Sequence, residues 1–173
     1  DTAMLTTALE ALAGAELNLG WPDSSLTRLR EMETLAANAG RRGLVRSARL
    51  AMARAHEARG SADSALFYHR RFLLEDSTAS NTTRWDTYNR LANHYLVRQR
   101  PDSARKYFEL VRAQITALTP PGVQVTPGAQ EIAANFGLGL VHLARGMLDS
   151  ARIEFTRALN GTAGRDRAVV LRS

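Results

Sequence analysis

Apolar residues recur at intervals of three and four along most of this 173-residue chain. Between residues 85 and 118, one such stripe precedes the tripeptide Asp102-Ser103-Ala104 and a second stripe follows it. This spacing is the period of an α-helix that buries one side. The first stripe is Trp85, Tyr88, Leu91, Ala92 and Tyr95, and the second is Ala104, Tyr107, Phe108, Val111, Ile115 and Leu118. The stretch therefore predicts a helix, a tight turn and a second helix.

The same unit recurs. The tripeptide returns as Asp63-Ser64-Ala65 and Asp149-Ser150-Ala151, with a weaker echo at Asp23-Ser24-Ser25. A second small residue lies twelve positions before each closing Ala or Ser, which predicts close approach of two helix backbones; the pairs are Ala13 and Ser25, Ala53 and Ala65, Ala92 and Ala104, and Gly139 and Ala151. Five positions before the closing residue stand Gly20, Gly60, Gln99 and Gly146. Glycine there ends a helix in the left-handed conformation. In the copy with Gln99, we expect Pro101 to stop the helix.

Four helical hairpins follow from this pattern. The predicted helices cover 2–19, 23–38, 43–59, 62–75, 84–99, 101–118, 129–145 and 148–160. We group them as repeats of about 2–38, 43–75, 84–118 and 129–160 in a single domain over 1–173. Residues 161–173 are expected to start a further helix or to form a cap.

The repeat resembles the tetratricopeptide repeat, a helix–turn–helix unit of about 34 residues. Tyr95 and Phe108 match its two aromatic positions in the third copy. His56 and His142 hold the first position in the second and fourth copies, and His69 and Phe155 hold the second. The first copy departs most, with Glu16 and Leu29 at these places. The closing residues are 40, 39 and 47 positions apart, which resembles the extended repeats of bacterial regulatory and signalling proteins.

The resemblance implies an all-α fold. Its form would be an α-α superhelix, a solenoid of about four antiparallel helix pairs, with the first helix of each pair on the concave face. In such a fold each pair needs its neighbours to bury its apolar side.

Composition narrows the class of protein. The chain has no cysteine, which excludes disulfides and thiolate metal sites. No stretch approaches the 18 apolar residues of a membrane span, and no signal peptide is visible. The chain opens on Asp1, and 165–173 resembles a helix start, so we expect a segment of a longer protein. The compartment is not readable from the sequence, although the cytoplasm is favoured.

The net charge of +6 has two interpretations, and all but one of the 23 basic residues are arginines. One is a nucleic-acid surface, since phosphate contacts need Lys and Arg. The other is an arginine-biased genome that places arginines on solvated helix faces. The arginines are spread over all four copies among 17 acidic residues, which favours the second interpretation.

We find no catalytic constellation in the sequence, and we expect no enzyme activity, no metal and no cofactor. His56 and His142 hold equivalent repeat positions, so we interpret them as packed interhelical residues. Gly137-Leu138-Gly139 lies inside a predicted helix and indicates close packing.

In the tetratricopeptide family, the groove is lined by first-helix positions that lie between the packing positions. Carried onto this sequence, the expected partner-binding residues are Arg54, Asn89, Arg90, Asn93, Phe136 and Leu140. Those of the third copy, Asn89, Arg90 and Asn93, should point away from the core. Asparagine amides bind peptide backbone, and arginine grips carboxylates with two donors. The alternative is that the polar residues are only solvated and that a following helix buries the apolar ones.

The leading hypothesis is a non-enzymatic protein- or peptide-binding scaffold with its partner in the concave groove. It would be the interaction or sensor segment of a larger bacterial signalling or regulatory protein. One alternative is a sensor for a small ligand or peptide signal, with 119–128 as a lid. A second is a nucleic-acid-binding solenoid, although no specific nucleic acid is expected. The sequence does not predict the oligomeric state.

Overall fold

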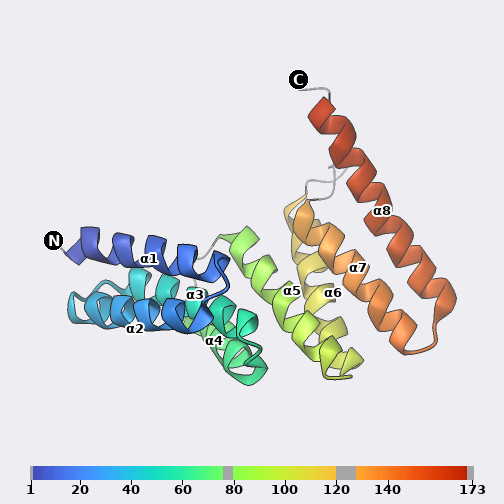
Figure 1. Ribbon diagram of the computed structural model, residues 1–173. Helices are drawn as coiled ribbons and strands as arrows, with labels where there is room; N and C mark the ends of the chain where they lie inside the picture. The colour runs from blue at the N-terminus through green and yellow to red at the C-terminus, as the bar shows by residue number, and fades with distance from the viewer. Residues whose placement is uncertain (1, 76–79, 120–127, 171–173) are drawn as a thin grey trace. The chain divides into compact units, whose positions relative to one another are not determined.

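A computed structural model describes residues 2–75, 80–119 and 128–170, with side chains up to residue 162 (Figure 1). Within these residues the structure is helical and contains no strand. The eight helices are α1 (Thr2–Asn18), α2 (Pro22–Asn38), α3 (Arg42–Ala58), α4 (Ala62–Glu75), α5 (Asn81–Val97), α6 (Pro101–Leu118), α7 (Ala129–Ala144) and α8 (Leu148–Val170). The all-α prediction and the eight predicted helices are confirmed.

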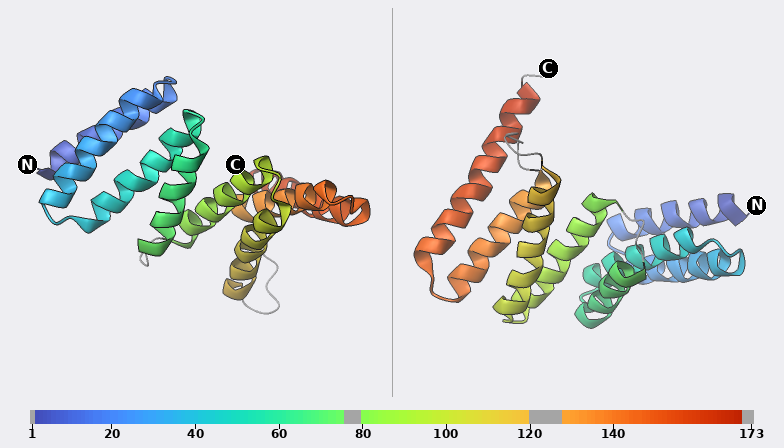
Figure 2. Two further views of the ribbon diagram at one scale, coloured as in Figure 1. Left: turned by 90° about the horizontal axis from the view of Figure 1, so that it is seen from below. Right: turned by 180° about the vertical axis from the view of Figure 1, so that it is seen from behind.

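The helices form two compact units, Asp1–Thr78 with α1–α4 and Ala79–Ser173 with α5–α8. We call them unit 1 and unit 2 and describe each by itself. Within each unit, every helix packs on the next one along the chain, and the two first helices also touch, α1 on α3 and α5 on α7. Figure 2 shows these hairpins from two further sides. The single domain over 1–173 stays a prediction.

All four hairpin turns use the left-handed backbone conformation. Gly20, Gly60 and Gly146 have φ of 79°, 81° and 73°, and Gln99 takes the same place with φ of 55°. The amides of Gln99 and Arg100 donate to carbonyls of the preceding turn at 2.9 Å. Pro101 begins α6, as expected. However, it does not end α5 in place of a left-handed residue, because Gln99 itself adopts the left-handed conformation. Gln99 makes that turn despite its Cβ, which glycine lacks.

The small residues of the repeat are buried where two helices meet. This holds for all eight of them: Ala13, Ser25, Ala53, Ala65, Ala92, Ala104, Gly139 and Ala151. Gly137 of α7 is a closer approach still, because a Cβ added there would overlap the ring of Phe108 on α6. Gly139 meets Phe155 of α8 in the same way. The predicted close packing of the Gly137–Gly139 stretch is therefore confirmed.

Two predicted boundaries differ from the structure by three residues or more, and the others agree within two. Helix α5 starts at Asn81, since the Ser80 side chain accepts a hydrogen bond from the Thr83 amide at 3.2 Å and caps the helix. Residues 161–170 continue α8 instead of starting a helix of their own. The lid predicted over 119–128 lies almost wholly outside the described residues. No described helix is both long and apolar enough to cross a membrane.

Candidate functional site

The polar part of the predicted groove lies on α5 in unit 2. Arg90 is half-buried, and its Nε donates to the Asp86 carboxylate at 2.9 Å, one turn earlier on the same helix. Asn93 is exposed. These side chains give α5 a surface that carries a cation, an anion and an amide, groups that suit the backbone and side chains of a peptide.

Asn89 does not belong to that surface. It is only 6% exposed, and its Nδ2 donates to the backbone carbonyl of Gln130 on α7 at 3.0 Å. Its Oδ1 is buried and accepts no hydrogen bond from the described residues. The prediction that Asn89 points away from the core is wrong, because α7 covers that side of α5. In the structure Asn89 joins the two first helices of unit 2.

The apolar part of the predicted groove lies on α7. Phe136 is 52% exposed, and its ring centroid lies 5.5 Å from that of Phe155 on α8. Leu140, one turn further along α7, is half-buried. Phe136 lines a hollow of about 620 Å³ whose walls are Ala129, Ile132, Ala133, Phe136, Phe155, Ala158, Leu159 and Thr162. None of these residues belongs to α5, so this hollow and the polar α5 surface are separate features.

A second hollow of about 320 Å³ continues the same surface and shares Phe155 and Leu159 with the first. Leu143 and Leu148 also line it, and both are exposed. We call the two hollows together the α7–α8 apolar face. Its large apolar side chains remain open among the described residues, whereas single exposed apolar residues are usual on any protein surface. Leu159 and Leu148 were not predicted, although their apolar character in the last repeat was the available signal.

Arg54, the remaining predicted partner-binding residue, is exposed on α3 in unit 1. Since it belongs to the other unit, a groove shared with Arg90 stays a prediction.

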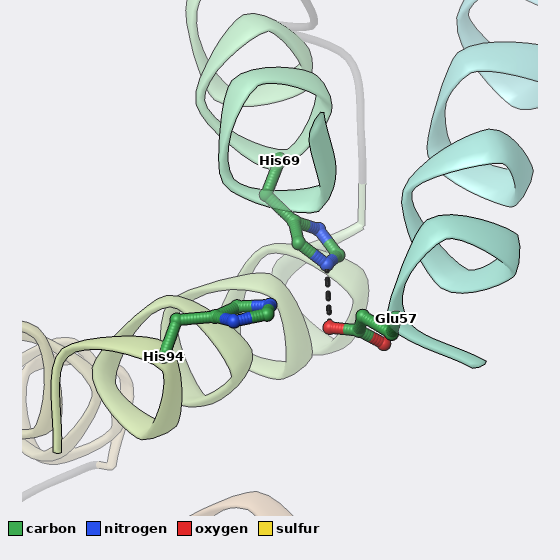
Figure 3. Close-up of side chains that lie close together, drawn as sticks. All are labelled: Glu57, His69 and His94. Carbon is green, nitrogen blue, oxygen red and sulfur yellow. Dashed lines mark hydrogen bonds and ion pairs between the residues drawn. The ribbon is translucent and has the colours of Figure 1, made fainter. Parts of the chain in front are cut away.

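Three residues after Arg54, Glu57 turns toward α4 and binds His69 (Figure 3). His69 is fully buried, and its Nε2 lies 2.9 Å from Glu57 Oε1. The sequence analysis missed this pair, which is separated by 12 residues.

His56 is a packed residue, as expected. It is buried, and its ring stacks on Tyr68 with centroids 5.5 Å apart. Burial lowers the pKa of His56 below its ordinary value of 6.5, and the nearby Arg30 and Arg59 guanidinium groups lower it further. The imidazole is thus held neutral for packing.

Neither unit by itself holds, in its described part, three His, Asp or Glu side chains close enough to bind one metal ion.

A polar hollow of about 1020 Å³ lies between α6, α7 and α8. Arg112 and Arg157 line it, and both donate to the buried Glu154 carboxylate, at 3.0 and 2.8 Å. Removing either arginine would leave a buried charge with one partner fewer, which is costly. The Arg112 contact ties α6 to α8, and the Arg157 contact lies within α8, so we assign both to stability.

Comparisons with known proteins agree with this architecture. No family profile matches the chain, and no curated protein sequence matches it. Among solved structures, the crystal structure of MamA is similar, with a TM-score of 0.68 and 18% identity over 94% of this chain and 81% of that one. A putative kinesin light chain from Podosopora anserina with nearly identical TPR-like repeats gives a TM-score of 0.70 and 17% identity, over 94% of this chain and 77% of that one.

BtubC (BKLC) from P. vanneervenii is similar as well. Its TM-score is 0.68, with 22% identity over 96% of this chain and 66% of that one. At such identities the likeness shows the fold alone. The repeat register, the left-handed turns and the buried small residues lead to the same result, and this chain therefore has the fold of the tetratricopeptide-like helical repeats.

Proposed function

We propose that this chain is a non-enzymatic protein-binding scaffold and that unit 2 carries its partner contacts. The observation that carries the proposal is the α7–α8 apolar face, with Phe136 half exposed beside Phe155. Exposed apolar patches of this kind mark interaction surfaces, since leaving them in water is unfavourable. Leu140 borders Phe136 by one helical turn and would extend the contact.

The polar surface of α5 would supply specificity. Arg90 and Asn93 lie three positions apart and therefore share one side of the helix. An arginine recognises a partner carboxylate, and an asparagine amide recognises its backbone. Arg54 on α3 offers the same chemistry on unit 1 and belongs to the proposal only as a separate surface. We further propose, from the resemblance of the extended repeats, that the scaffold serves a bacterial signalling or regulatory protein.

The test is affinity capture with the whole chain followed by mass spectrometry, and then titration of the captured partner against variants. Phe136→Asp should weaken binding about tenfold or more, since it removes a large apolar contact. Arg90→Glu with Asn93→Ala should weaken it less. Lys106→Glu is the matched control, because Lys106 is exposed on α6. A partner that binds all these variants equally would exclude unit 2 as the contact surface.

A further inference from the structure

Helix α1 carries two apolar stripes. One side carries Leu9 and Ala13, which belong to the buried core of unit 1. The other side carries Ala8, Ala11, Leu12 and Ala15, and all four are exposed. Each apolar stripe of a helix normally packs against a neighbour. The open side of α1 therefore indicates a missing neighbour.

The repeat register shows what that neighbour resembles. Aligning the small packing residue of the first copy, Ala13, with Gly139 of the fourth copy places the open side of α1 on four residues of α7. These are Ala134, Gly137, Leu138 and Val141, and every one of them is buried. In unit 2, α7 packs on α5 and α6. Helix α1 thus carries the docking side of an internal first helix, but with nothing over it among the described residues.

The α7–α8 apolar face is the repeat equivalent of the surface that receives α7. Moving along by the 47-residue spacing takes Asn89 to Phe136 and Phe108 to Phe155. Asn89 and Phe108 are 6% and 1% exposed beneath α7, whereas Phe136 is 52% exposed and Phe155 is half-buried. The chain therefore displays both halves of one interface: a docking helix and a receiving face.

We propose that α1 of one copy docks on the α7–α8 apolar face of a second copy, in the manner in which α7 docks on α5 and α6. In this arrangement Ala11 meets Phe155, as Gly137 meets Phe108. Ala11 has one methyl group more than Gly137. Ala158 stands where α6 has the larger Val111, which provides room for it. This inference rests on the proposed function, since it names a second copy as one partner of the Phe136 surface.

The interface is heterologous, because two different surfaces meet. After one contact, the first molecule still has an open α7–α8 apolar face and the second still has an open α1. Association of this kind continues head to tail. The same pairing between two identical α1 helices would instead stop at a dimer, which gives the two arrangements different outcomes.

The experiment is sedimentation velocity of the whole chain over a wide range of protein concentration. The wild type should form assemblies that grow with concentration. Leu12→Ala should raise the dissociation constant about tenfold or more, because a leucine buried in the interface is truncated. Leu12→Arg and Leu159→Arg should each abolish association. Leu12 and Leu159 are 45% and 68% exposed, so both variants should keep the helix content of the wild type by circular dichroism.

Mixing separates head-to-tail docking from every other arrangement. Leu12→Arg blocks α1 and leaves the receiving face intact, whereas Leu159→Arg does the reverse. An equimolar mixture should therefore yield one-to-one dimers and nothing larger. A wild type that stays monomeric overturns the proposal. So does a Leu159→Arg variant that still associates, which would show pairing between α1 helices, or a Leu12→Arg variant that does, which would show pairing between receiving faces.

Two further variants complete the design. Val97→Arg changes an apolar residue that is exposed at the end of α5 and lines neither hollow of the α7–α8 apolar face, so it should associate like the wild type. Arg90→Glu with Asn93→Ala tests the proposed function separately. If self-association is absent but this double variant loses a captured partner, only the head-to-tail inference fails. If the chain associates and no other partner depends on unit 2, the wider scaffold proposal fails.

Discussion

The two hairpins of unit 2 follow the same repeat pattern but have different surroundings. In the hairpin of α5 and α6, Phe108 is 1% exposed because Gly137 of α7 lies against its ring. In the hairpin of α7 and α8, the equivalent Phe155 is half-buried and borders an apolar hollow of about 620 Å³. The same aromatic position is thus core in one hairpin and surface in the next.

This difference shows that a repeat position does not by itself determine burial. A repeat encodes a hairpin and two surfaces, and each surface becomes core only when a neighbour covers it. The α7–α8 apolar face carries the large apolar residues that are typical of a surface buried by a neighbouring hairpin. We interpret that mismatch between sequence and exposure as the signature of an interaction surface.

The largest expected effect is a difference between the two aromatic positions. Phe108→Ala should lower the free energy of unfolding by about 3–5 kcal/mol, since it leaves a cavity in a packed interior. Phe155→Ala should cost only about 1–2 kcal/mol under dilute conditions, because part of the ring is already in contact with water. Urea unfolding of both variants measures the difference. Equal costs would contradict the distinction between the covered and the open hairpin.

Two substitutions of alanine by leucine test whether the equivalent positions of α7 and α1 are covered or open. Ala134→Leu should destabilise the chain by about 1–3 kcal/mol, because the site is fully buried and has no room for the longer side chain. Ala8→Leu, at the equivalent exposed position of α1, should change the stability by less than about 0.5 kcal/mol. Thermal melts at low protein concentration provide the measurement. If Ala8→Leu is as damaging as Ala134→Leu, α1 is covered within the monomer.

A substitution in the turn of the α5–α6 hairpin is expected to raise the stability of the chain. Gln99→Gly should stabilise the chain by about 1 kcal/mol, since a non-glycine residue is strained at the left-handed φ of 55°. The reverse change, Gly60→Gln at the equivalent turn in unit 1, should destabilise by a similar amount. Chemical unfolding of both variants measures the two effects. A neutral Gln99→Gly would mean that the glutamine side chain compensates for the strain.

The smallest effect concerns His56, whose place in the third copy is held by Tyr95. The two rings stack on equivalent tyrosines, His56 on Tyr68 and Tyr95 on Tyr107. The pKa of His56 is lowered in the folded state, so the unfolded chain binds the proton more readily. Its contribution to stability is therefore complete above pH 6.5 and declines as the pH falls from there through the folded pKa.

The matched variant for this effect is His56→Tyr, which restores the residue type of the third copy. It should flatten the stability profile just below pH 6.5. Glu75 provides the contrast within the same unit: its pKa is lowered by hydrogen bonds from Arg71 and Arg49, so its contribution is lost only in more acidic solution, below pH 4.5. An unchanged slope in His56→Tyr would show that another group titrates in this window.

Much of the fold was predictable because its signals are local. The period of three and four fixed the helices, and the small residues twelve positions apart fixed the register of each hairpin. The left-handed turn at Gln99 was harder to predict, since the sequence has no glycine at that position. The site was predicted less well. Asn89 lies on α5 between packing positions of its own hairpin, but α7 approaches from 41 residues away and covers it.

By itself, then, the sequence determined the helices, the turns and the residues of each repeat that pack within their own hairpin, since these depend on neighbours a few positions away. It also determined that α1 and α8 are rich in apolar residues. Only the tertiary structure decided which of those residues have a partner. Burial depends on the surface brought by the next hairpin, and that surface is far along the chain for Asn89 and Phe108 and, within the described residues, missing for Phe136 and Leu12.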